Sequence, residues 1–186
     1  MITPRTQHIA VIGGGFSGTM AAVNLARLSA TPLRVTLLNH GSPAGRGIAY
    51  GTRRPEHLLN VAARNMSALP DHPNHFLEWL RTRTEYADVP EAELRETFMP
   101  RRVYGDYLRS LAQHYARPVD PRGGAEFAQL NDEVLALGPA GSGARPAARN
   151  HAYSMLVTGV RPIRSGRTSA SWAGLSSGRP SSEPMT

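Results

Sequence analysis

The sequence predicts an α/β fold built on a parallel β-sheet, and the order of patterns in its first 40 residues carries this prediction. An apolar run at His8–Ile12 is followed by a glycine cluster at Gly13–Gly18, and residues 19–28 have apolar positions at helical spacing. A second apolar run, Leu33–Leu38, begins directly after Pro32. Strand, turn, helix and strand in this order, with a short link before the second strand, predict a parallel right-handed crossover.

After the second run, the pattern becomes a loop and then a group of helices. Pro43–Thr52 contains three glycines and is expected to be an irregular loop. A helix is predicted from Asp71 to near Thr84, with Asp71 or Asn74 as its cap, and Pro90 opens a short acidic helix. The clearest amphipathic helix is Arg101–Tyr115, in which Tyr and Leu recur at steps of three and four residues.

The last third of the chain is predicted to hold two short strands and a disordered end. Val134–Leu137 and Ala152–Thr158 are expected as strands, and Gly138–Asn150, rich in Gly, Pro and Ala, as a flexible connection between them. Beyond Pro162 the sequence is mostly Ser, Gly, Pro and Arg, with little to bury, so disorder is expected there.

Composition removes several classes of function. The 186 residues include no cysteine, so the chain cannot have a disulfide framework, a thiolate metal site or a cysteine nucleophile. All 21 basic residues are arginines, which excludes the phosphate-binding lysine of a P-loop.

The net charge of +7 is concentrated in Gly138–Thr186, which has six arginines against Glu183 alone. That segment lacks interleaved aromatic residues, so specific nucleic-acid binding is not expected. No apolar run approaches the length of a membrane span, and a cytoplasmic location is the expectation.

The glycine cluster has the spacing G-x-G-x-x-G, formed by Gly13, Gly15 and Gly18. Gly13 permits the sharp turn after the strand, Gly15 leaves room for a pyrophosphate, and Gly18 lets the helix pack closely on the strand. Unpaired amides at the helix start, from Gly15 through Phe16 and Ser17 to Gly18, suit a phosphate diester. The cluster, with Gly14 inside it, therefore predicts a Rossmann-type dinucleotide site, and the alternative is an ordinary tight turn.

The end of the second strand departs from the usual dinucleotide pattern. An acidic residue is expected there to hold the adenosine ribose, but the position is Asn39. An amide oxygen can accept a hydrogen bond yet brings no charge, so we expect Asn39 to hold the ribose less firmly than a carboxylate would.

Three further stretches, taken with the glycine cluster, resemble a known family. They are G-R-G-I-A-Y-G-T at 45–52, H-L-L-N-V at 57–61 and F-M-P-R-R-V-Y-G-D-Y-L at 98–108. Over about residues 8–117 the chain resembles bacterial FAD/NAD(P)-binding proteins, which are related to flavin-dependent monooxygenases and include urate-hydroxylase-like members. The resemblance implies an FAD held by its ADP half on Gly13–Gly18 and reduced by NAD(P)H at a second site. It places Arg46 near the cofactor and Arg101 near the mouth of the site, the alternative for each being a solvated arginine.

The resemblance also bears on the end of the predicted domain. M-L-V-T-G at 155–159 is similar to the strand ending in A-T-G that returns the chain to the FAD sheet in such flavoproteins, with Val157 at the alanine position. A second glycine fingerprint for NAD(P)H and a late acidic segment near the flavin are absent from this sequence, so a truncated form is expected. The expected organisation is a partial dinucleotide-binding domain at 1–162, with a helical insertion at about 65–117, and a tail at 163–186.

These patterns lead to a ranked set of functional hypotheses. The first is an FAD-dependent, NAD(P)H-using oxidoreductase of the monooxygenase-like class acting on a small-molecule substrate; the others are a non-catalytic dinucleotide-binding module and an inactive fragment. No catalytic acid or base stands out. His72, His75 and Glu78 have spacing that could place them on one helical face, but His72 precedes Pro73 and no fourth ligand is suggested, so no metal site is expected. The oligomeric state has no signature in the sequence.

Overall fold

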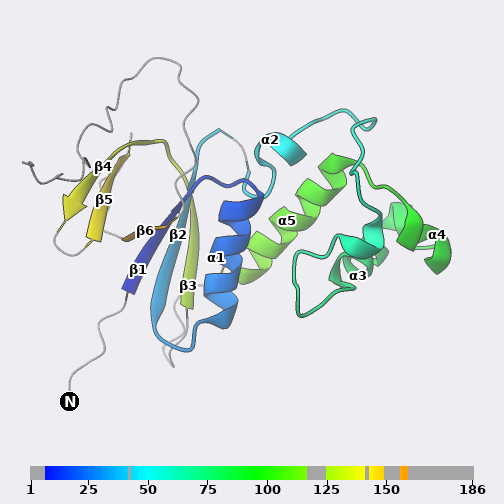
Figure 1. Ribbon diagram of the computed structural model, residues 1–186, viewed down its shortest axis with the longest axis horizontal. Coiled ribbons are helices and arrows are strands. Elements are labelled where there is room, and N and C mark those ends of the chain that lie inside the picture. Colours follow the sequence, from blue (N-terminus) through cyan, green and yellow to red (C-terminus); the bar gives the residue numbers. More distant parts are fainter. Residues whose placement is uncertain (1–6, 42, 117–124, 141–142, 149–155, 159–186) are drawn as a thin grey trace, which may run out of the picture.

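The fold is a parallel sheet covered by helices on one face and by a β-hairpin on the other (Figure 1). The computed structural model describes residues 7–41, 43–116, 125–140, 143–148 and 156–158. The sheet has the strand order β3-β2-β1-β6, and all of its neighbouring strands are parallel. Figure 1 places α1 and α5 side by side against the sheet, with α3 and α4 beyond α5. The predicted α/β class is therefore confirmed.

The first crossover follows the predicted order. β1 (Gln7–Ile12) and β2 (Leu33–Asn39) pair in parallel, and α1 (Phe16–Leu28) connects them. Alternate residues of the two strands face opposite sides of the sheet, as the period of a strand requires. Val11 and its neighbours on that face join the main core under the helices, whereas Ala10 and Leu38 pack with Val134 on the hairpin side.

Two strands lie where no strand was predicted. β3 (Ala125–Asn131) extends the sheet beyond β2, although only Phe127 among its residues is buried. β5 (Gly143–Ala148) pairs in antiparallel fashion with β4 (Val134–Ala140), so the prediction of a flexible connection over 138–150 was wrong for the part that the structure describes. Backbone pairing, and not an apolar side-chain pattern, defines both strands.

The helical region is held by buried aromatic and leucine side chains. It comprises α3 (His75–Arg81), α4 (Glu91–Glu96) and α5 (Arg101–Tyr115), with the 3₁₀ turns η1 (Ala63–Asn65) and η2 (Thr84–Tyr86). Phe76, Tyr104 and Tyr107 are almost completely buried, and their ring centroids lie 4.9 to 5.6 Å apart. These three rings form the centre of the helical region.

The ends of these helices agree with the prediction only in part. Asn74 occupies the N-cap position of α3, but its side chain makes no capping hydrogen bond. Instead, its Oδ1 atom accepts a hydrogen bond of 3.4 Å from Arg95 in α4. The side chain of Arg81, at the end of α3, donates to the carbonyl oxygens of Tyr86 and Ala87 and so joins α3 to the following turn.

The segment predicted to return the chain to the sheet does so. β6 (Leu156–Thr158) pairs in parallel with β1, with Leu156 opposite Ile9 and Thr158 opposite Val11. The remainder of the predicted strand at 152–155 and the predicted disordered tail after Pro162 lie outside the described residues. The proposed domain limits, 1–162 and 163–186, stay predictions. Among the helices of the described segments, none has the length and apolar character needed to span a bilayer.

Candidate functional site

The glycine turn between β1 and α1 is tied to the end of β2 by two backbone amides. The Gly13 N–H donates to the carbonyl oxygen of Leu38 at 2.8 Å, and Gly13 has a positive φ of 97°, which favours glycine. The Gly14 N–H donates to the Oδ1 atom of Asn39, also at 2.8 Å. Gly15 is the N-cap of α1 in an extended conformation, so the helix begins at Phe16. The amides predicted to face a ligand therefore stand at the start of α1.

The three fingerprint glycines differ in what surrounds them. A Cβ atom added to Gly18 would overlap the carbonyl oxygen of Gly13, so the close packing predicted at Gly18 is present. A Cβ atom added to Gly15 would meet nothing within 4 Å. Open space at Gly15, directly before the first turn of α1, matches the shape expected of a pyrophosphate cradle.

Asn39 lies at the predicted place but has an additional contact. Its amide oxygen, which was predicted to accept a hydrogen bond from a ribose, already accepts one from the Gly14 N–H. A Cβ atom on Gly14 would lie only 2.7 Å from the Asn39 side chain, so Gly14 leaves the room that this contact needs. Asn39 therefore fixes the conformation of the turn as well as lining its edge.

A cavity of about 180 Å³ opens beside Asn39 at the carboxyl ends of β2 and β3. Its other lining residues come from β2, from β3 and from the loop after β2: Leu37, Pro43, Ala44, Gln129, Leu130 and Asn131. Nucleotides bind to parallel sheets at this edge. Gln129 and Asn131 were not predicted as site residues, because the strand that carries them was not recognised. A polar residue at the end of an unrecognised strand gives no signal by itself.

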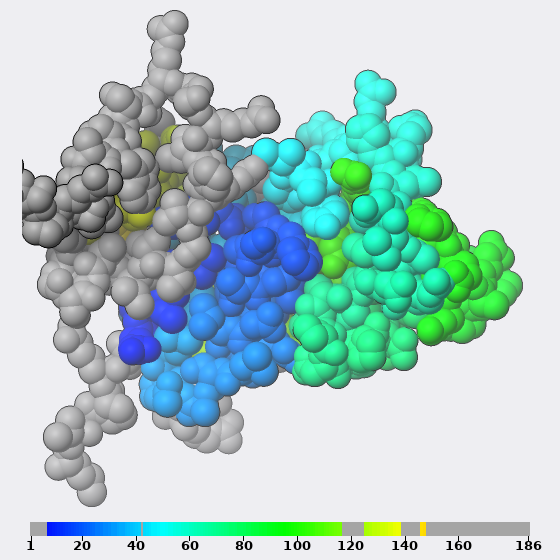
Figure 2. Space-filling view, in the orientation of Figure 1, coloured from blue at the N-terminus to red at the C-terminus, as the bar shows by residue number. Residues whose placement is uncertain are grey.

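The loop predicted at Pro43–Thr52 contains a short helix, α2 (Gly47–Tyr50), which corrects the prediction that it is wholly irregular. α2 lies at the N-terminal end of α1 and packs against α5 (Figure 1). In the space-filling view, this part of the chain, in cyan, sits at the upper end of the blue α1 surface (Figure 2). The loop therefore borders the glycine turn.

The two arginines singled out from the sequence lie in different surroundings. Arg46, the residue before α2, forms an ion pair with Asp106 of α5, and its Nε atom is buried with no hydrogen-bond partner among the described residues. Arg101 is exposed. Its Nε atom donates to the carbonyl oxygen of Leu58 at 3.0 Å, and its backbone N–H donates to the carbonyl oxygen of His57. Arg46 lies next to the turn, because the residues on either side of it, Gly45 and Gly47, contact Gly14 and Gly15. The described contacts of Arg101 instead join α5 to residues 57–58.

Three aromatic rings from three helices gather next to the turn. Phe16 of α1, Tyr50 of α2 and Tyr104 of α5 have ring centroids 4.9 to 6.4 Å apart. Phe16 remains 42% exposed. Burial raises the pKa of the Tyr50 hydroxyl, with a smaller opposing effect of Arg101, and burial also raises the pKa of Tyr104. Both hydroxyls therefore keep their protons at neutral pH and do not serve as bases there.

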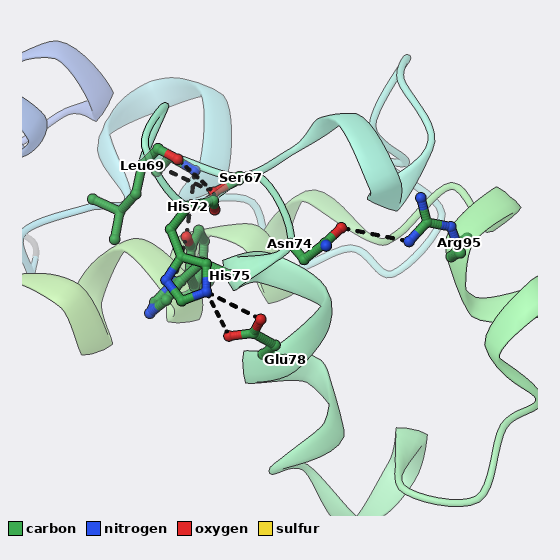
Figure 3. A network of polar contacts seen from close by, with 9 residues as sticks. Ser67, Leu69, His72, Asn74, His75, Glu78 and Arg95 are labelled. Atoms are coloured by element: carbon green, nitrogen blue, oxygen red, sulfur yellow. Dashed lines mark hydrogen bonds and ion pairs between the residues drawn. The ribbon is translucent and has the colours of Figure 1, made fainter.

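The histidines considered as metal ligands take part in a network that stabilises the start of α3 (Figure 3). His72 Nε2 lies 3.1 Å from the Glu78 carboxylate, and Ser67 Oγ donates to the carbonyl oxygen of His72 at 2.7 Å. His75 Nδ1 lies 2.9 Å from the hydroxyl of Tyr107 in α5. In the described segments, no group of three or more His, Asp or Glu residues is arranged to hold a metal ion.

Comparison with known families agrees with this geometry. The profile of the FAD-NAD(P)-binding family matches residues 10–157, which include the glycine turn, the helical region and the strand that returns to β1. The chain belongs to the FAD-NAD(P)-binding family. The search of curated proteins found no significant match. The resemblance stated from the sequence is thereby confirmed at the level of the family.

Several solved structures resemble this chain over part of their length. A lysine monooxygenase from Nocardia farcinica matches 82% of this chain, with 14% identity and a TM-score of 0.50. A flavin monooxygenase from Stenotrophomonas maltophilia matches 82%, with 20% identity and a TM-score of 0.48, and a bacillithiol disulfide reductase from Staphylococcus aureus matches 80%, with 17% identity and a TM-score of 0.47. At 14% identity, the likeness to the lysine monooxygenase concerns the fold alone. The chain spans 44%, 36% and 35% of these three proteins, respectively.

Proposed function

We propose that this chain binds the ADP half of FAD at the glycine turn and belongs to an NAD(P)H-dependent flavoprotein oxidoreductase of the monooxygenase-like class. The observation that carries the proposal is the open space at Gly15, at the start of a helix that packs without any gap at Gly18. A tight turn that only linked β1 to α1 would not need both features. The family to which the chain belongs supports the choice of a dinucleotide as ligand.

The residues present fit such a ligand. The amides of residues 15–18 would bind the diphosphate, since unpaired N–H groups and the positive end of the helix dipole both favour an anion. Arg46 would add a positive charge beside the turn, because Gly45 and Gly47 on either side of it contact the turn. The cavity lined by Asn39 and Asn131 would take the adenosine end. When bound, FAD supplies the electron chemistry, while the protein supplies orientation and electrostatics. The substrate would be a small molecule.

The proposal is tested by flavin titration with a matched pair of variants. Gly15→Ala places a methyl group in the cradle without a clash in the folded protein, so FAD affinity should fall about tenfold or more while the melting temperature changes little. Gly138→Ala is the control, because a Cβ at Gly138 also meets nothing within 4 Å but lies in β4, away from the turn. Flavin fluorescence measures both affinities. Equal FAD affinity in the parent and in Gly15→Ala would contradict the proposal.

A second candidate function is a dinucleotide-binding module without redox activity. The observation that favours it is the hydrogen bond from Gly14 to Asn39, which uses part of the hydrogen-bonding capacity of a side chain that carries no charge. Anaerobic addition of NADH or NADPH to the FAD-loaded protein separates the two candidates. Loss of the yellow colour of oxidised flavin supports the oxidoreductase, and stable colour with tight FAD binding supports the module.

A further inference from the structure

Residues 45–47 contact the glycine turn through hydrogen bonds and a close backbone approach. The Gly45 N–H lies 2.9 Å from both the carbonyl oxygen of Gly14 and the hydroxyl oxygen of Thr19, and that hydroxyl itself donates to Gly14 at 3.3 Å. Thr19 is completely buried. A Cβ atom on Gly47 would lie 2.8 Å from the Cα of Gly15, so the two backbones are in direct contact. Arg46 is therefore placed between two residues that touch the turn.

Arg46 and Tyr50 also contact α5, at Gly105. A Cβ atom on Gly105 would lie 2.8 Å from the carbonyl oxygen of Tyr50 and 3.2 Å from the Cγ of Arg46. Because Gly105 has no side chain, α5 approaches closely enough for the next residue, Asp106, to pair with the guanidinium of Arg46. The side chains of Arg46 and Asp106 are 28% and 34% exposed, so the pair lies partly out of water.

We propose that Asp106 is a positioning residue that holds the Arg46 guanidinium beside the glycine turn, where it assists the binding of a nucleotide diphosphate. This inference rests on the proposed function. One Nη atom of Arg46 is fixed by the carboxylate, and the buried Nε–H has no acceptor among the described residues. A long arginine side chain loses much rotational freedom when it binds an anion, and a carboxylate that fixes it beforehand lowers that cost.

The opposite effect would be expected if Asp106 simply competed with phosphate for Arg46. Removal of the carboxylate would then release the guanidinium and strengthen binding. In a double-mutant cycle on FAD affinity, the interaction energy between Arg46 and Asp106 would then have the opposite sign. The two accounts therefore predict affinity changes in opposite directions.

The test is a double-mutant cycle on FAD affinity with Arg46→Ala, Asp106→Ala and the double variant. Arg46→Ala should weaken FAD binding about tenfold, as expected for a hydrogen bond to a charged group. Asp106→Ala should weaken it about three- to tenfold in the parent and not at all in the Arg46→Ala background. Asp106→Glu should restore part of the affinity. An Asp106→Ala variant with equal or higher affinity than the parent, or with the same loss in both backgrounds, would overturn the inference.

Two controls separate positioning from a purely structural role. Adenosine lacks the diphosphate, so its affinity should be the same in the parent and in Asp106→Ala, whereas a collapsed turn would weaken both ligands. Glu96→Ala breaks the ion pair with Arg64 in the helical region and should leave FAD affinity unchanged, with melting temperatures recorded for all variants. If the parent binds neither FAD nor ADP, the proposed function fails and the inference with it. If the parent binds both and the cycle shows no coupling, only the inference fails.

Discussion

The glycine turn and the helical region achieve close packing in opposite ways. Around the turn, backbone meets backbone: Gly18 lies against Gly13, and Gly47 lies against Gly15. In the helical region, large side chains fill the space, with Phe76 and Tyr107 completely buried. The two regions therefore tolerate different changes. The turn packs closely because its glycines have no side chains, so larger residues there should destabilise it. The helical region packs through large side chains, so smaller residues there should leave cavities and destabilise it.

The largest expected effect is a deletion in the helical region. Phe76 is fully buried and its ring contacts those of Trp79, Tyr104 and Tyr107. Phe76→Ala should lower the free energy of unfolding by about 3–5 kcal/mol, through lost burial and the cavity left behind. Denaturant titration measures the change. Phe98→Ala is the control, since Phe98 is 48% exposed, and its loss should be clearly smaller. Similar losses for both would mean that burial does not distinguish the two sites.

An addition at the turn should come next in size. Gly18→Ala would place a methyl group onto the carbonyl oxygen of Gly13, which cannot move without disturbing the end of β1. We expect a loss of about 3 kcal/mol in the free energy of unfolding. Gly15→Ala, measured by the same titration, should lose about 1 kcal/mol or less, because alanine is a poorer N-cap than glycine but its Cβ atom meets nothing within 4 Å. The proposed contrast between the two glycines would be broken if both variants unfolded at the same denaturant concentration.

The smallest expected effect is a pH dependence that comes from His75 in the helical region and from His8 in β1, the strand before the glycine turn. Burial lowers the pKa of His75, with His72, His114 and Arg27 acting in the same direction and Glu78 against it. Burial also lowers the pKa of His8, with Arg34 in the same direction and Glu126 against it. A lowered pKa in the folded chain means that the unfolded chain binds more protons, so stability is complete above the ordinary histidine pKa of 6.5. It should decline as the pH falls below that value.

This pH dependence is measured as the melting temperature from about pH 8 to pH 5, in the parent, His75→Gln and His8→Gln. Each variant should show a shallower decline than the parent. A decline of the same steepness in all three proteins would assign the effect to other groups. A change in only one variant would assign the effect to that histidine.

The sequence predicted the elements that have continuous apolar runs or apolar positions at helical spacing, and it missed the strands that are defined by backbone pairing. β1, α1 and β2 were predicted in order because an apolar run, a glycine cluster, a segment with helical spacing and a second apolar run follow one another along the chain. β3 was missed, since its only buried residue is Phe127, and β5 was missed because its sequence, GARPAA, has the composition of a loop. Such strands exist because a neighbour offers hydrogen bonds to their backbone.

The candidate site was predictable to a similar degree. The fingerprint glycines and Arg46 are recognisable because their spacing or their motif is local. The partners of these residues are distant in the sequence: Asn39 lies 25 residues from Gly14, and Asp106 lies 60 residues from Arg46. An aspartate inside an amphipathic helix normally faces water, so nothing in the local pattern marks Asp106 as a neighbour of the turn.

The pairing of β6 with β1 has a consequence for how the protein is made. β1 contains Ile9, and its partner Leu156 leaves the ribosome only after all of the intervening chain has been synthesised. During that interval one side of the nascent sheet has no neighbouring strand, and its peptide groups are exposed to other chains. Slow translation or a high local concentration of ribosomes should therefore favour aggregation through this edge, and a chaperone that shields β1 should raise the yield of folded protein.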